Sequence, residues 1–316
     1  MAPNITTEFR QMRIVYPEFQ YAHSVLDRVR EARRAALALN GIRIEAPFVT
    51  LFGDSHAGKS TILDSYLETH FPNGVDLQRP DGPSPQRTAV ALTLNGVSTY
   101  TSFLRQMLKA FADPFPSEGN PDKKLDRIVN YIKKFNVELL IFDEANNLRI
   151  RKATDLDATQ THNTLRGLAK SGCPIVTVGT KEAADKILSD DQIMSLVEDI
   201  SIRELDRSSI GDLKLFGSFC AALGVKLKEH GLFPERSNFV VGNTVSCLFL
   251  ASGGLRGRLS RLVERAAYIA KEEGATCVGI DHLEGAIDLY SIKNKIISYN
   301  PIREARKTKS RETRVG

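Results

Sequence analysis

The sequence predicts an α/β fold in which helices cover both faces of a parallel sheet, followed by a smaller all-helical domain. Two observations support this prediction. Strand-like and helix-like runs alternate from about residue 47 to residue 200, and this alternation indicates βαβ units with parallel strands. Beyond residue 200 the strand-like runs end, and helical periodicity continues to Ile292.

The expected elements follow in order along the chain. A helix rich in Ala, Leu and Arg is expected around Tyr21–Leu39, and Pro47 separates it from the first strand because proline disfavours helix before it. The strand-like runs, which are apolar or β-branched, are Phe48–Phe52, Thr88–Leu94, Val137–Phe142 and Pro174–Val178. The helix-like runs between them are Lys59–His70, Tyr100–Phe111 and Asp122–Phe135, the last preceded by a Pro/Gly break at Asp113–Pro121.

These patterns divide the 316 residues into four parts, and the length itself suggests about two folding units. We expect an N-terminal helical extension (1–46), an α/β domain (47–200), a smaller helical domain (201–292) and a basic tail (293–316). The last 16 residues are polar and cationic, so we expect them to be disordered in isolation. The N-terminus has no apolar signal core and no apolar run reaches membrane-helix length, so we expect a cytoplasmic protein.

The net charge of +5 is concentrated at the two ends of the chain. Residues 1–43 carry +3 and residues 301–316 carry +4, which leaves −2 for the rest. This distribution excludes a histone-like polycation but allows local contact with nucleic acid or an acidic partner. The four cysteines contain no Cys-x-x-Cys pair, so we expect free thiols rather than a zinc site.

A phosphate-binding loop follows the first strand and opens the next helix. Gly53-Asp54-Ser55-His56-Ala57-Gly58-Lys59-Ser60 matches G-x-x-x-x-G-K-[ST] at every fixed position. The glycines let backbone N–H groups surround a phosphate, and the helix dipole favours the same anion. Lys59 is expected to reach the β- and γ-phosphates and Ser60 to ligate Mg²⁺. We therefore expect ATP to contact Gly53, Asp54, Ser55, His56, Ala57, Gly58, Lys59, Ser60 and Thr61, with His56 at a variable position.

Two carboxylates follow the third strand. Asp143 and Glu144 come directly after Phe142, at the edge of the sheet where ligands bind in open α/β folds. Asp143 is expected to hold Mg²⁺ together with Ser60, and Glu144 to activate a water. Small-molecule kinases need no such acid, so the pair favours ATP hydrolysis. A small-molecule phosphotransferase is an alternative interpretation. Such an enzyme would transfer phosphate to an acceptor rather than to water, and its activity would not change when DNA is added.

With these motifs the chain resembles the AAA+ ATPases, and among them the TniB/TnsC family of transposition regulators, with MuB a more distant relative. The resemblance covers roughly residues 10–290. The segments that carry it, besides the phosphate loop, are Tyr16-Pro17, Leu140–Leu148, Ile175–Ala183 and Ser252–Leu259. It implies a P-loop AAA+ sheet with a helical lid, and an ATP-dependent protein that oligomerises on duplex DNA. It further implies that the protein selects a target site and recruits a transposase, with a target-selector protein as a possible partner.

The resemblance also implies further site residues. Thr180 falls where the family keeps a polar sensor of the γ-phosphate, although it could instead cap the next helix. Arg256 or Arg258 falls where the lid supplies a second sensor, although these arginines could form a solvated helix face. Family members typically carry a trans-acting arginine after the fourth strand, and the stretch Gln192–Asp199 has none. Arg203 or Arg207, just downstream, could substitute; without an arginine finger we expect slow turnover.

DNA contact is expected to involve phosphates and to be largely independent of sequence, because no base-reading element is evident. By analogy with the family, the candidate residues are Thr99, Tyr100, Lys123, Lys124 and Arg127, and their alternative role is a solvated helix face. The tail could grip DNA, dock on a transposase or only improve solubility. The alternative function is that of an AAA+ helicase loader or replication initiator that acts on a protein partner and shares every ATP-site residue.

Overall fold

The computed structural model describes residues 3–39, 45–71, 78–79, 82–83, 88–96, 99–148, 156–187 and 194–315, and the chain divides into two compact units. We call residues 17–55 and 62–202 the α/β unit, and residues 1–16, 56–61 and 203–316 the helical unit. The predicted N-terminal extension, 1–46, is therefore shared: residues 1–16 belong to the helical unit and the following helix to the α/β unit.

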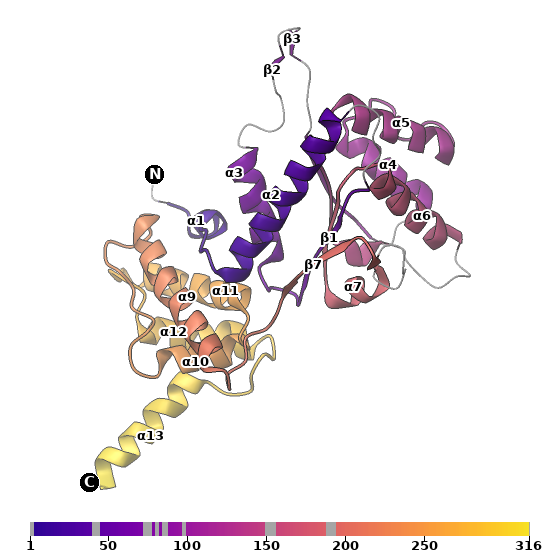
Figure 1. The fold of residues 1–316 in the computed structure, drawn as a ribbon. Helices are drawn as coiled ribbons and strands as arrows, with labels where there is room; N and C mark the ends of the chain where they lie inside the picture. The colour runs from indigo at the N-terminus through magenta and orange to yellow at the C-terminus, as the bar shows by residue number, and fades with distance from the viewer. Residues whose placement is uncertain are drawn as a thin grey trace. The chain divides into compact units, whose positions relative to one another are not determined.

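The α/β unit is built on a five-stranded parallel sheet (Figure 1). The strands are β1 (Phe48–Gly53), β4 (Ala89–Thr93), β5 (Leu139–Asp143), β6 (Ile175–Gly179) and β7 (Val197–Ile202), in the spatial order β4-β5-β6-β1-β7. Its helices are α2 (Pro17–Ala38), α3 (Lys59–His70), α4 (Tyr100–Ala110), α5 (Pro121–Lys134), α6 (Leu156–Lys170) and α7 (Lys181–Ile187), with a 3₁₀ turn η1 (Ala145–Asn147). The short β2 (Gln78–Arg79) and β3 (Gly82–Pro83) form a separate antiparallel pair.

Both faces of this sheet are buried, as near-continuous apolar strands require. Phe48 of β1 and Phe142 of β5 belong to a core shared with α4, α5 and α6. The alternate residues of the strands, such as Leu51 and Ile141, are equally buried outside that core. In Figure 1, α4, α5 and α6 group on one side of the sheet, and α2 and α3 lie on the other. The α/β architecture predicted from strand–helix alternation is confirmed.

The fifth strand, β7, was not predicted, because its sequence alternates instead of forming an apolar run. Ile200 and Ile202 are buried, whereas Glu198 and Asp199 between the apolar positions suggest a polar loop. Partners on neighbouring elements satisfy these two acids. Thr50 of β1 donates a hydrogen bond to the Asp199 carboxylate at 2.6 Å, and Arg28 of α2 pairs with Glu198. Helix α6 also lacked a prediction from the sequence.

The helical unit is made of helices that pack around one apolar core. They are α1 (Ile5–Gln11), α9 (Ile210–Glu229), α10 (Thr244–Ser252), α11 (Arg256–Glu272), α12 (Ile280–Ala286), a π-helical turn η2 (Ile287–Ile292) and α13 (Pro301–Val315). Within the described residues, no helix is long and apolar enough to span a bilayer.

The prediction of a disordered tail is wrong for residues 301–315, which form α13. Pro301 occupies the first helical position, where its missing N–H costs nothing, and Ile302 is buried in the core. Acidic side chains of α12 and η2 neutralise the first basic residues: Arg303 pairs with Glu284 at 3.1 Å, and Arg306 pairs with Glu284 at 2.8 Å. Composition suggested a free cationic segment, but two of its six basic residues, Arg303 and Arg306, pair with acids of the helical unit.

Candidate functional site

The start of the predicted phosphate loop and the two predicted carboxylates lie at one edge of the sheet. Gly53 ends β1 and Asp143 ends β5, and both strands flank β6, which ends at Gly179. Because all these strands are parallel, their carboxyl ends meet at the same edge, and the chain order reverses around β1. Ligands bind at such a reversal in open α/β sheets, so the topology points to this edge as the site.

Two glycines fix the shape of the loop for different reasons. A β-carbon on Gly53 would lie 2.4 Å from the backbone oxygen of Ile202, so only glycine allows β1 to approach β7 this closely. Gly58 has a φ of +103°, a conformation that other residues rarely adopt. Helix α3 then begins at Lys59, which directs its free N–H groups toward the loop. Beside the loop, Lys181 lies 3.5 Å from the Asp54 carboxylate.

The acids that end β5 have a strained and partly organised geometry. Glu144 has a φ of 54°, which is uncommon for a residue with a side chain, and its N–H donates to Asp143 Oδ1 at 2.8 Å. The Asn146 side-chain amide donates to Glu144 Oε2 at 3.0 Å. Asn146 therefore orients the Glu144 carboxylate. It lies within the segment Leu140–Leu148, but the sequence alone does not indicate this role. The carboxylate of Glu144 stays exposed and can accept a proton.

Thr180 directly follows β6. Its carbonyl accepts hydrogen bonds from the N–H groups of Ala183 and Ala184 at 3.0 and 3.1 Å, which starts α7. In the described part of the chain its hydroxyl has no hydrogen-bond partner. The backbone of Thr180 thus begins the helix, and its hydroxyl stays available at the sheet edge.

In the helical unit, the lid arginines adjoin the second half of the phosphate loop. A β-carbon on Gly257 would lie 2.1 Å from the His56 backbone oxygen, so the first turn of α11 packs directly on the loop. Arg256 is buried and stacks on the ring of Tyr16, with 4.2 Å between its guanidinium carbon and the ring centroid. Arg256 therefore does not lie on a solvated helix face.

The positive charge around the loop is visible in the pKa of His56. Burial lowers this pKa most, and the positive charges of Arg258, Arg261 and Lys59 lower it further. Burial alone says nothing about the sign of a ligand's charge, but the three cations around the loop favour an anion. The arrangement therefore suits the phosphates of a nucleotide.

The two candidate trans arginines differ in their surroundings. Arg203 forms two hydrogen bonds with the buried carboxylate of Asp212, one of them 2.7 Å long. The bonds from Arg203 and the backbone N–H of Asp206 lower the pKa of Asp212 to about 2. Arg203 is thus engaged within its own chain, which makes it the less suitable of the two candidates for a trans arginine. Arg207 is exposed, and no described residue forms an ion pair or hydrogen bond with its side chain.

Several of the residues predicted to contact DNA have internal partners. Lys124 is 2% exposed, and its ammonium donates to the backbone oxygens of Ser117, Glu118 and Gly119. Arg127 pairs with Asp113 at 3.2 Å and also donates to Phe115. Both cations hold the loop before α5, and the prediction for Lys124 is wrong because its ammonium is buried.

The remaining DNA candidates divide in the same way. The Thr99 hydroxyl caps α4 by accepting a hydrogen bond from Ser102 N–H at 3.3 Å. Tyr100 is buried and bonded to Thr164 at 2.9 Å, so its prediction as a DNA contact is wrong. Lys123 is exposed, and its side chain has no partner among the residues that the structure describes. Of the five candidates, Lys123 fits a phosphate contact best.

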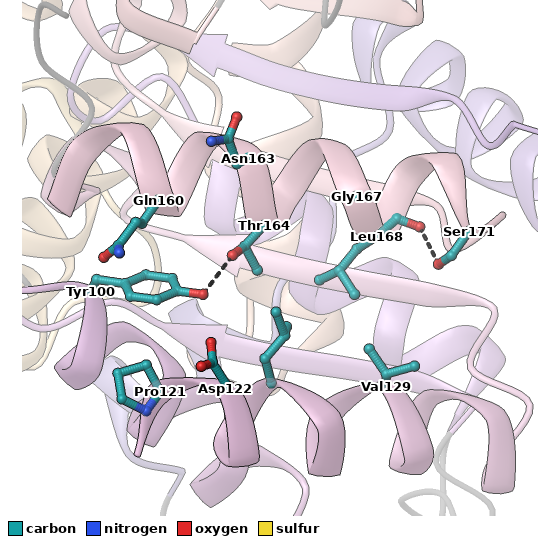
Figure 2. Close-up of a pocket in the computed structure, with 11 residues that line it drawn as sticks. Tyr100, Pro121, Asp122, Val129, Gln160, Asn163, Thr164, Gly167, Leu168 and Ser171 are labelled. Carbon is teal, nitrogen blue, oxygen red and sulfur yellow. Dashed lines mark hydrogen bonds between the residues drawn. The ribbon is translucent and has the colours of Figure 1, made fainter. Parts of the chain in front are cut away.

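A separate groove lies between α5 and α6. Figure 2 shows Val129 and Leu168 facing one another across it, with Tyr100 and Thr164 bonded at one end. Its volume is about 560 Å³. The loop and carboxylates of the sheet edge do not line it, so it is not the predicted nucleotide site.

Residues 11–206 match the sequence model of a known family, described as bacterial TniB protein. The chain belongs to the TniB family. A search of curated protein sequences gives no match.

Solved structures agree on the fold of this TniB-family protein. Cdc6p from Pyrobaculum aerophilum superposes with a TM-score of 0.59 at 14% identity, over 90% of this chain and 70% of that protein. Aeropyrum pernix ORC2, in a structure with ADPNP and ADP, superposes with a TM-score of 0.53 at 12% identity, over 84% of this chain and 67% of that protein. Aeropyrum pernix ORC1 in complex with DNA superposes with a TM-score of 0.52 at 15% identity, over 86% of this chain and 65% of that protein. The fold is therefore the P-loop AAA+ fold.

Proposed function

We propose that this TniB-family protein is an ATPase that assembles on duplex DNA in the presence of ATP and regulates target selection in transposition, where it recruits a transposase. The observation that carries the proposal is the single sheet edge at which the phosphate loop, Asp143, Glu144 and Thr180 follow parallel strands. Family membership favours transposition as the process. The DNA named with the similar ORC1 structure makes duplex DNA the first ligand to test.

The residues present suit Mg²⁺. Its preferred ligands are oxygens, and Ser60 in the first turn of α3 and Asp143 at the end of β5 offer a hydroxyl and a carboxylate. When bound, the ion would neutralise charge on the phosphates of ATP. In the proposed site Ser60 and Asp143 would hold the ion, and Lys59 with the loop N–H groups would bind the β- and γ-phosphates.

Hydrolysis in this proposal depends on Glu144. Its carboxylate, oriented by Asn146, takes a proton from the attacking water, and the Thr180 hydroxyl donates a hydrogen bond to the γ-phosphate. Arg256 and Arg258 supply positive charge from the lid. Arg207, exposed and without an internal partner among the described residues, is the proposed trans arginine of a neighbouring subunit.

Electron microscopy of the full chain with random duplex DNA tests the proposal. We expect continuous assemblies with a non-hydrolysable ATP analogue, and none without nucleotide. Lys59→Ala is the matched control, because it removes the phosphate contact and should abolish assembly. Small isolated rings or monomers on DNA would instead favour a loader or initiator that acts on a protein partner. Phosphate transfer to a small acceptor, unchanged by DNA, would contradict both.

A further inference from the structure

The N-terminal segment, residues 3–16, is anchored on the helical unit. Ile5 and Met12 are buried in its core. Thr6 donates a hydrogen bond to Glu264 at 2.9 Å, and Glu8 lies 2.9 Å from His230. These contacts lie along both α1 and the segment that follows it, so the segment presents its last residue, Tyr16, in a fixed position.

Tyr16 contacts both the phosphate loop and the lid. Its ring forms an edge contact with Phe219, with 6.1 Å between centroids, and the guanidinium of Arg256 lies over the ring. Its hydroxyl lies 3.1 Å from the position that a β-carbon on Gly58 would occupy. One side chain therefore contacts the glycine that shapes the loop and the arginine that opens α11.

Arg256 depends on this contact more than a surface arginine would. It is only 3% exposed, so its charge has lost most of its hydration. The face of an aromatic ring compensates a desolvated guanidinium and also restricts its orientation. Since Gly257 packs against the His56 carbonyl, the backbone beside Arg256 cannot move away without breaking that contact.

We infer that Tyr16 is a positioning residue that holds Arg256 beside the phosphate loop, so that the N-terminal segment sets how strongly the site prefers ATP to ADP. The inference rests on the proposed ATPase function. A guanidinium that is already oriented loses little entropy when it meets the γ-phosphate, whereas a free one must be ordered first. ADP lacks the γ-phosphate and gains less from this preorganisation.

The test measures the dissociation constants of ATP and ADP for the full chain and for Tyr16→Leu, Tyr16→Phe and Arg256→Gln. Tyr16→Leu keeps an apolar side chain but removes the ring face, and we expect about tenfold weaker ATP binding with little change for ADP. Tyr16→Phe keeps the ring and should restore ATP affinity to near the parent value. With Arg256→Gln already present, Tyr16→Leu should add no further loss.

Several outcomes would overturn the inference. Equal weakening of ATP and ADP would show a merely structural role, and stronger ATP binding by Tyr16→Leu would show that the ring sequesters Arg256. Additive losses in the double variant would also contradict it. If Tyr16→Leu fails to fold, Tyr16→Phe and Arg256→Gln still test the inference. Tyr16→Phe keeps the aromatic ring, so a loss of ATP preference as large as that of Arg256→Gln would exclude a role for the ring face. A parent protein that binds no nucleotide would refute the proposed function itself.

Discussion

The two ends of β5 both carry carboxylates, and their surroundings give them opposite roles. At the amino end, Glu138 is 8% exposed and accepts hydrogen bonds from Arg30 and Arg34, each at 2.9 Å. At the carboxyl end, Glu144 is exposed, has a positive φ and contacts the neutral amide of Asn146. The first acid is paired with two arginines and joins α2 to the sheet, whereas the second faces solvent at the edge where the proposed site lies.

The same difference separates pairs of cations elsewhere in the chain. Arg203 is bonded to Asp212, while Arg207, four residues later, has no partner in the described residues. The buried ammonium of Lys124 donates hydrogen bonds to backbone oxygens, while its neighbour Lys123 is exposed. Residue type and spacing do not distinguish the members of such pairs. Internal partners do, and each pair can be tested by matched substitutions.

The largest effect is expected for Glu144→Gln. The amide cannot accept a proton from water, so ATP hydrolysis should fall about 10²–10⁴-fold. Nucleotide affinity should stay near that of the parent, because the loop and Lys59 still bind the phosphates. Steady-state phosphate release and equilibrium binding of ATP measure the two quantities. Undiminished hydrolysis would remove Glu144 from the proposed mechanism.

Glu138→Gln should instead reduce stability. Removing the charge of Glu138 leaves the buried Arg30 without its nearest carboxylate, with only Asp27, at 3.9 Å, left among the described acids, and breaking a buried pair costs about 3–5 kcal/mol in the free energy of unfolding. Urea denaturation measures this loss, with Glu144→Gln as the control that should unfold like the parent. A loss below about 1 kcal/mol, the value for exposed pairs, would mean that the two ends of β5 do not differ as described.

Arg203→Ala and Arg207→Ala test the cations in the helical unit. We expect Arg203→Ala to lower stability by about 2 kcal/mol, between the values for exposed and buried pairs. Arg207→Ala should leave stability unchanged and lower hydrolysis in the assembled state by tenfold or more. Hydrolysis that survives Arg207→Ala would contradict its proposed trans role.

The Arg203–Asp212 pair also predicts a pH dependence. The pKa of Asp212 falls from an ordinary 3.8 to about 2 in the folded protein, chiefly through the bond from Arg203. Its contribution is therefore complete above pH 4 and is lost as the pH falls toward 2. Denaturation midpoints measured across this range should fall less steeply in Asp212→Asn than in the parent. Identical slopes would mean that the ion pair does not lower this pKa.

The sequence predicted the α/β fold because apolar strands and intervening helices leave a local pattern. It also predicted the phosphate loop and the strand-end acids, whose chemistry is tied to fixed spacing along the chain. Strand β7 was missed because its acids are compensated by partners on other elements, such as Thr50. The cation at Lys124 was misassigned for the same reason, since its three acceptors are backbone oxygens that no sequence motif marks. Tyr16 contacts an arginine that lies far away in the sequence, and Asn146 acts through the orientation of its side chain. Neither can be read from the spacing of residues along the chain.

The smallest effects are expected from the two lysines at the start of α5. Lys124→Met keeps the buried stem but removes the ammonium from the backbone oxygens of Ser117 and Glu118, which should cost about 1.5 kcal/mol of stability. Lys123→Met should leave stability unchanged. If Lys123 contacts one phosphate, its loss should reduce the slope of log K against log salt by about 0.9 in DNA binding.

Fluorescence anisotropy with a random duplex at several salt concentrations measures this slope in the presence of ATP. Lys124→Met is the matched control, because it removes the same charge from the neighbouring position while the surface of α5 is retained. An equal change of slope for both lysines would mean that only net charge matters. A change for Lys124→Met alone would mean that its buried ammonium is released on DNA, and the distinction between engaged and exposed cations would then fail at this helix.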